Sequence, residues 1–280
     1  MRRSVAAELF LLRRRASTWI LLGIWTTLAT FFSYVLPYVD YRNEQGNTGP
    51  GVVPLEDLVP HSFAGHLSEG FPFFGGVFAL MLGVLALGSE YGWGTLRTLL
   101  VQRPGRLRMF GAKLLALGAA LVPFVLAVYA VGAVSSYAIA RGEGAAIDWP
   151  SAWLVLRALA AGWLIMAAWA ALGIALGVLS RGTSLAIGVG ILYALIIEGL
   201  ISAFADQVSL LEPLVQFFLR ANAYSLVAGV GATTSGAAGN GPGAFEGPYV
   251  APEQALLVLV AYVACFLVLT GFALRRRDVT

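Results

Sequence analysis

Long apolar runs separated by polar segments divide this chain into six stretches, each near the ~20 residues that an α-helix needs to cross a bilayer. The runs are Ser17–Tyr38, Phe71–Gly88, Lys113–Ala140, Trp153–Ser180, Ser184–Ala205 and Gln254–Leu274. The third and fourth exceed a perpendicular crossing, so we expect tilt, and Pro123 should kink the third because proline lacks a backbone donor. The pattern predicts an all-α polytopic membrane protein with six transmembrane helices, in which residues 1–280 form a single transmembrane domain.

The composition indicates the same class of protein. Apolar residues make up 59% of the chain and charged residues 12%, and the mean hydropathy is +0.80. A soluble domain of this length could not bury so much apolar surface. Cys265 is the sole cysteine, which excludes an intramolecular disulfide.

The basic residues predict the orientation. Of the 18 lysines and arginines, only Arg42, Arg141, Arg157 and Arg220 fall on the outer side or near the outer ends of the spans if both termini are cytoplasmic. Basic residues concentrate in cytoplasmic loops. We therefore expect an even number of spans with both termini in the cytoplasm.

Residues 1–16 show helical periodicity before the first span. Their apolar positions are Val5, Leu9, Leu12 and Ala16. Arginines flank this stripe on both sides, a pattern typical of an amphipathic helix on a membrane surface. We expect a short interfacial helix that contacts lipid at the inner leaflet.

Residues 206–253 form a long outer segment before the last span. Leu210–Leu226 is amphipathic, so it could lie at the membrane surface or dip into the membrane. Gly229–Pro248 is rich in Gly, Ala, Ser and Thr and predicts a flexible loop. The sequence leaves the role of this outer segment open.

The loop at residues 89–108 carries the most distinctive polar pattern. Trp93, Leu96, Leu99 and Leu100 fall on one face of a short helix, which Pro104-Gly105 would end. Such a cytoplasmic helix could lie on lipid headgroups, pack against the bundle, or enter a groove on a soluble partner. The periodicity does not choose between these three uses.

The residues from Ser89 to Leu100, SEYGWGTLRTLL, resemble the loop after the second span of type-2 ABC transporter permeases. In that family a Glu-Tyr-x-x-Gly-Thr-Leu-Arg stretch followed by basic residues is common. The basic N-terminal helix, six spans, large outer segment and arginine-rich tail extend the resemblance over the whole chain. It implies a membrane subunit of the bacterial multidrug or peptide-antibiotic exporter type, located in the plasma (inner) membrane.

The resemblance also implies partners. These are a cytoplasmic ABC ATPase subunit and a second copy of this permease or a homologous permease, with no nucleic acid. The residues implied at the ATPase contact are Glu90, Thr95, Leu96, Arg97, Arg103 and Arg106. The chain contains no G-x-x-x-x-G-K-[ST] phosphate loop. ATP and Mg would therefore be bound by the partner, and we expect no cofactor and no catalytic residue in this chain.

Glu198 is the clearest ionisable group inside a predicted span. A carboxylate there is costly unless it is paired, protonated or exposed to water. Two interpretations stay open: a contact on the substrate path or gate, and an interhelical hydrogen bond or a position near the outer headgroups. Arg157 is a candidate ion-pair partner.

Small residues in the fourth predicted span indicate close helix packing. Ala170, Gly173 and Gly177 form a stripe that would let another helix approach its backbone, and Gly75-Gly76 could do the same in the second span. The partner of this stripe is not identified by the sequence.

Other functions find less support. His61 and His66 lie near Asp57 and Glu69, but their spacing matches no zinc pattern, so we expect surface histidines and no metal site. No His-Glu-x-x-His, Gly-x-Ser-x-Gly or intramembrane acid pair indicates an enzyme. An ion-gradient-driven secondary transporter, or a membrane scaffold or sensor, remains an alternative to an ATP-driven exporter of hydrophobic or amphipathic compounds. The substrate, and the choice between homodimer and heterodimer, stay open.

Overall fold

A computed structural model describes residues 2–43, 53–92, 106–205, 212–232 and 250–276. The described residues contain helices and no strand, as the hydropathy pattern predicts. Five helical stretches are long and apolar enough to cross a membrane: Ala16–Asn43, Phe63–Gly88, Arg108–Glu143, Ala152–Ser180 and Pro252–Arg275. They correspond to the first, second, third, fourth and sixth predicted runs.

The fifth predicted run is also helical but is not among these five stretches. Helix α10 (Thr183–Leu192), π-helix η3 (Tyr193–Ile197) and α11 (Glu198–Ala205) follow one another without a break. Only Thr183–Leu192 stands out as an apolar helix, and it is shorter than a span. The described residues therefore contain five helices long and apolar enough to cross a membrane, and a sixth span stays a prediction.

The remaining elements have the following bounds. The first span comprises α2 (Ala16–Thr30), π-helix η1 (Phe31–Val35) and α3 (Leu36–Asn43); the second comprises α5 (Phe63–Ser68), π-helix η2 (Phe71–Gly75) and α6 (Gly76–Gly92). Helices α8 (Arg106–Glu143), α9 (Ala152–Ser180) and α14 (Pro252–Arg276) form the other three. The short helices are α1 (Arg2–Arg14), α4 (Leu55–Leu58), α12 (Glu212–Val215) and α13 (Leu219–Ala228). Helix α8 continues through Pro123.

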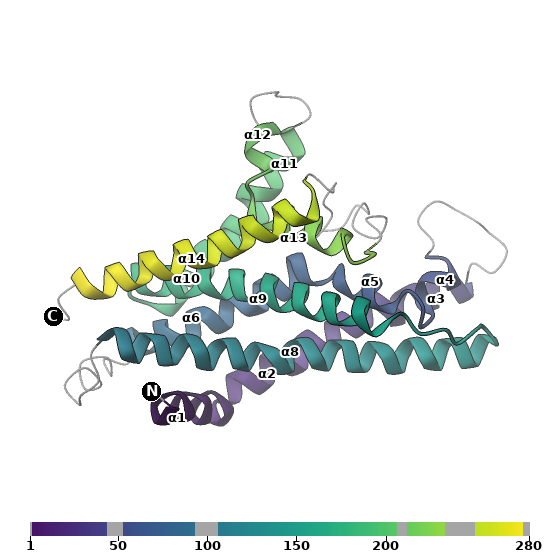
Figure 1. Cartoon of the computed structure of the whole chain (residues 1–280), viewed down its shortest axis with the longest axis horizontal. Coiled ribbons are helices and arrows are strands. Elements are labelled where there is room, and N and C mark those ends of the chain that lie inside the picture. Colours follow the sequence, from purple (N-terminus) through teal and green to yellow (C-terminus); the bar gives the residue numbers. More distant parts are fainter. Residues whose placement is uncertain (1, 44–52, 93–105, 206–211, 233–249, 277–280) are drawn as a thin grey trace.

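The long helices lie side by side in one bundle (Figure 1). Helix α9 lies centrally, in contact with α6, α8, α10, α13 and α14. Both chain ends lie at the end of the bundle where α6 ends and α8 begins (Figure 1). Helices α11 and α12 stand away from the bundle. Helix α13 packs against both α9 and α14, toward the opposite end of the bundle.

Helix α1 confirms the predicted N-terminal helix and is fastened to the bundle by two polar contacts. Lys113 Nζ forms an ion pair with Glu8 Oε2 at 2.8 Å, with the lysine side chain 4% exposed. Arg15, which follows α1, donates from Nη1 to the carbonyl oxygen of Leu85 at 2.8 Å. Phe10 and Leu11 of α1 are exposed. Contact of this helix with inner-leaflet lipid stays a prediction.

The second span begins earlier than predicted. Hydropathy placed its start at Phe71, whereas helix α5 begins at Phe63 and every residue from Phe63 to Ser68 is buried. Polar residues in this segment lower its hydropathy, but they have partners inside the bundle. Ser68 Oγ donates to the carbonyl oxygen of Ala64 at 2.7 Å and lies 2.7 Å from the Tyr129 hydroxyl.

Helices α6 and α9 touch backbone to backbone through glycine. A Cβ atom on Gly83 would collide with the carbonyl oxygen of Ala170, and one on Gly173 would collide with the carbonyl oxygen of Leu80. Gly76 packs against the Trp169 ring. A Cβ atom added to Gly76 would lie 2.5 Å from Trp169 Nε1. The predicted small-residue stripe is therefore confirmed as a packing face, and its partner is the second span of the same chain.

Replacing Gly173 by leucine should destabilise the bundle. The new side chain would collide with the backbone of Leu80 in α6, and no change of its rotamer would relieve the collision. We expect a cost of about 3 kcal/mol, equivalent to a fall of roughly 5–10 °C in the thermal unfolding midpoint in detergent. The matched control is Gly188→Leu in α10, where an added Cβ meets nothing within 4 Å. Equal midpoints for the two variants would show that the α6–α9 contact is not close.

Candidate functional site

Two of the six predicted ATPase-contact residues lie at the end of the bundle where α6 ends and α8 begins. Glu90 belongs to the last turn of α6 and Arg106 is the first residue of α8. Thr95, Leu96, Arg97 and Arg103 lie outside the described residues. These two helix ends lie near both chain ends (Figure 1). The assignment of all six residues to an interface stays a prediction.

Glu198 is fully buried at the junction between η3 and α11. Its Oε1 accepts the backbone N–H of Leu219 at 2.9 Å, and its Oε2 accepts the backbone N–H of Arg220 at 3.0 Å. Leu219 and Arg220 are the first two residues of α13. The first N–H groups of a helix have no partner within the helix, and the helix dipole favours a negative charge there. Glu198 therefore caps α13 from another segment of the chain.

Two further side chains complete the surroundings of this carboxylate. The Tyr193 side chain, one turn earlier in the same helical stretch, also lies close to the Glu198 carboxylate. Arg220 is close enough to interact electrostatically with the carboxylate. Its Nη1 donates to the carbonyl oxygen of Ala194 at 3.3 Å, and its guanidinium lies 5.7 Å from the centre of the Phe73 ring. A buried carboxylate needs this combination of opposite charge and hydrogen bonds.

Arg157 is not the partner of Glu198, contrary to the sequence-based expectation. Its Nη2 donates to the carbonyl oxygen of Gly229 at 3.0 Å, whereas the carboxylate of Glu198 is bound by the start of α13. Sequence reasoning missed Arg220, which was placed near the outer ends of the spans. The signal that could have identified it was the single arginine in an otherwise apolar stretch, Phe217 to Ala221.

Helix α13 is buried from Leu219 to Val227, so this part of the outer segment dips into the bundle and does not lie on its surface. Two of its polar side chains donate hydrogen bonds to nearby backbone. Asn222 Nδ2 donates to the carbonyl oxygens of Gln216 and Phe218 at 2.8 Å, and Ser225 Oγ donates to that of Ala221 at 2.9 Å. Their bonds to nearby backbone make burial of an amphipathic sequence acceptable.

The histidines differ from the expected pair of surface residues. His61 is exposed, but His66 is buried and its Nε2 lies 2.5 Å from the carbonyl oxygen of Ser33. Because a carbonyl can only accept, Nε2 must carry the proton. The described residues contain no group of three or more His, Cys, Asp or Glu side chains placed to hold a metal ion. His66 thus links the first and second spans.

Glu198 tests how far α13 depends on its cap. Glu198→Ala removes both acceptors and the charge opposite Arg220, so we expect a loss of about 3–5 kcal/mol, the usual cost of breaking a buried charged pair. Glu198→Gln keeps one acceptor oxygen and should lose less. Thermal unfolding in detergent measures both, with the exposed Glu56→Ala as control. If Glu198→Gln left stability and transport unchanged, a role on the substrate path or gate would be excluded.

Comparison with known proteins gives this architecture a family. No curated protein matches the chain. The family model described as ABC-2 family transporter protein matches residues 5–279, nearly the full length, from α1 through the last span. The chain therefore belongs to the ABC-2 family of transporter proteins.

Proposed function

We propose that this chain is the membrane-spanning subunit of an ATP-driven exporter that moves a hydrophobic or amphipathic substrate outward. The observation that carries the proposal is the family match over residues 5–279. The sequence contains no phosphate-binding loop of the G-x-x-x-x-G-K-[ST] type. A separate ATPase subunit would therefore bind ATP and Mg and supply the energy.

The packing of α6 and α8, the helices that border residues 93–105, supports a role in coupling. The loop connects α6 to α8, and α6 contacts α9 through glycine without intervening side chains. Close-packed helices move together more readily than they deform. A displacement of the loop by an ATPase subunit would thus be passed through α6 to α9, the helix at the centre of the bundle.

Helix α1 provides a second connection at the same end. Its Glu8–Lys113 ion pair ties it to the start of α8, and the bond from Arg15 to Leu85 ties its C-terminal end to α6. Helix α1 therefore connects α6 and α8, the two helices that border residues 93–105. In the proposed cycle α1 moves with them along the inner leaflet.

The proposal includes a second permease copy or a homologous permease in a bacterial inner membrane. The first and last spans support it, because only 17% of each apolar window is buried within the chain. Such faces must contact lipid or another membrane protein. In the proposed topology six spans cross the membrane and both termini are cytoplasmic.

Arg97→Glu should weaken the ATPase contact. Reversing one charge of an interfacial pair costs at least as much as truncating it, about 2–5 kcal/mol, so we expect association or ATP hydrolysis by the complex to fall about tenfold or more. The matched control is Arg141→Glu, an exposed arginine at the opposite end of α8. Unchanged association, ATP hydrolysis and transport in Arg97→Glu would contradict the interface.

The topology can be tested by cysteine labelling. Because Cys265 is the sole cysteine, Cys265→Ser provides a background for single cysteines at Thr48, Gln102, Ser235 and Val279. A membrane-impermeant maleimide added to intact cells should label positions 48 and 235, and label 102 and 279 only after permeabilisation. Labelling of position 279 but not 235 in intact cells would show five crossings and contradict the proposed topology.

A further inference from the structure

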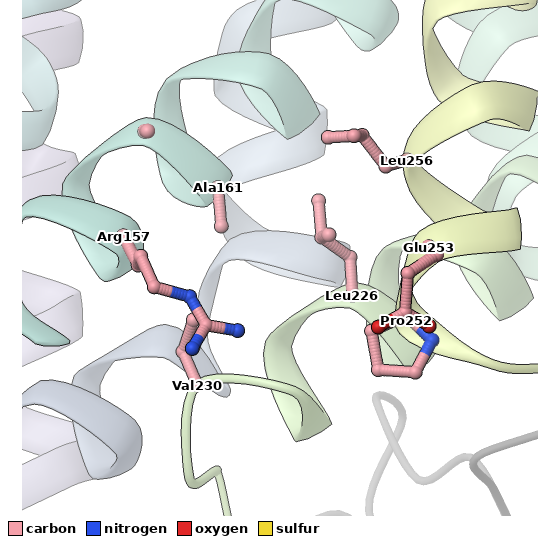
Figure 2. Close-up of a pocket in the computed structure, with 8 residues that line it drawn as sticks. Arg157, Ala161, Leu226, Val230, Pro252, Glu253 and Leu256 are labelled. Carbon is pink, nitrogen blue, oxygen red and sulfur yellow. The ribbon is translucent and has the colours of Figure 1, made fainter.

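A cavity of about 250 Å³ lies between α9, α13 and α14. Figure 2 shows Arg157 of α9 on one side and Pro252 and Glu253 of α14 on the other, with Leu226 of α13 between them. The remaining lining is apolar and includes Ala160 and Leu256. The cavity thus combines one cation, one anion and hydrophobic walls.

Its two charges are not neutralised by an ion pair among the described residues. Neither Arg157 nor Glu253 forms an ion pair with the other or with any residue in the described part of the chain. Arg157 uses one of its nitrogens, Nη2, on the carbonyl oxygen of Gly229, which fixes the guanidinium at the cavity and leaves its other N–H groups as donors. Opposite charges that share a cavity without pairing are suited to a ligand that carries both charges.

The position of the cavity points to a lipid. Arg157 lies in the second turn of α9 and Glu253 in the first turn of α14. Trp153, one turn before Arg157, is 66% exposed, and exposed tryptophans at the ends of spans mark the level of the lipid headgroups. Ala160 and Leu256 lie about one turn further along their helices, toward the hydrocarbon region. The charges therefore sit at headgroup level above apolar walls.

We propose that this cavity binds the headgroup of an aminophospholipid, such as phosphatidylethanolamine, as a resident ligand. The phosphate accepts hydrogen bonds from Arg157, whose planar donors suit phosphate oxygens. The primary ammonium donates to the Glu253 carboxylate, and the first methylenes of the acyl chains contact Ala160 and Leu256. A choline headgroup has no N–H to donate, and an anionic headgroup without an amine brings no cation to Glu253.

The inference does not depend on the transported substrate or on an ATPase partner, so binding to the full-length chain tests it directly. The chain, purified in mild detergent and delipidated, is mixed with phosphatidylethanolamine, phosphatidylcholine or phosphatidylglycerol of identical acyl chains. Native mass spectrometry measures the lipid retained. We expect phosphatidylethanolamine to be retained about tenfold more than either other lipid, because each lacks one charged hydrogen bond.

Three variants locate the binding. Glu253→Gln should remove the preference for phosphatidylethanolamine over phosphatidylcholine, and Arg157→Gln should lower retention of all three lipids. Ala160→Phe should block binding by filling the cavity without changing its charge. The controls Glu56→Gln and Arg141→Gln carry the same changes on exposed residues outside the cavity and should behave like the unmodified chain.

Equal retention of the three lipids by the unmodified chain would overturn the proposal. So would an unchanged preference for phosphatidylethanolamine in Glu253→Gln, or unchanged retention of all three lipids in Arg157→Gln. Each variant carries an exposed substitution, and its thermal unfolding midpoint verifies that it is folded.

Discussion

The close contact between α6 and α9 is the constraint on which the rest of the structure depends. Gly83 and Gly173 bring the two backbones together so closely that neither position tolerates a side chain. Helix association inside a membrane gains little from the hydrophobic effect, so dispersion between close surfaces must supply much of the attraction. With α6 fixed on α9, α14 and α13 pack on α9, and α10 packs on both.

Around that apolar centre, buried polar side chains bind backbone oxygens at π-helical turns. His66 donates to Ser33 in η1, and Arg220 donates to Ala194 in η3. A π-helical turn disturbs the regular hydrogen-bond ladder, and in a membrane every freed carbonyl needs another donor. The same stretch that contains η3 also contributes Glu198, which caps α13. The fold thus uses its few ionisable residues to join segments that apolar packing alone would not position.

Much of the architecture could be predicted because the hydropathy of a span is a sum over many residues, so that a few polar positions do not hide it. The runs of about 20 apolar residues correctly located five spanning helices, and the spacing of Ala170 and Gly173 revealed a packing face. The pattern could not supply the partner of that face, because several helices carry small residues. Residues 63–68 fell outside the second predicted run because the polar residues His66 and Ser68 lower the hydropathy there. The buried partners of these two residues come from distant parts of the sequence.

In the candidate sites too, single residues could be predicted from the sequence but their partners could not. Glu198 stood out as a carboxylate within an apolar run, but its partners, Leu219 and Arg220, depend on how the outer segment folds back. The cavity lined by Arg157 and Glu253 is formed by residues that are 96 positions apart in sequence. No local pattern predicts such a pair. The ATPase-contact residues within residues 89–108 were identified by resemblance to a family, and their contact with another polypeptide stays a prediction.

The central claim is that this chain works with a separate ATPase, and purification from its native host tests it most directly. The tagged chain, extracted in mild detergent, should bring with it a cytoplasmic ATPase in a fixed ratio, and the complex should hydrolyse ATP. A chain that purifies alone and transports in liposomes under an ion gradient, without ATP, would contradict the account and identify a secondary transporter.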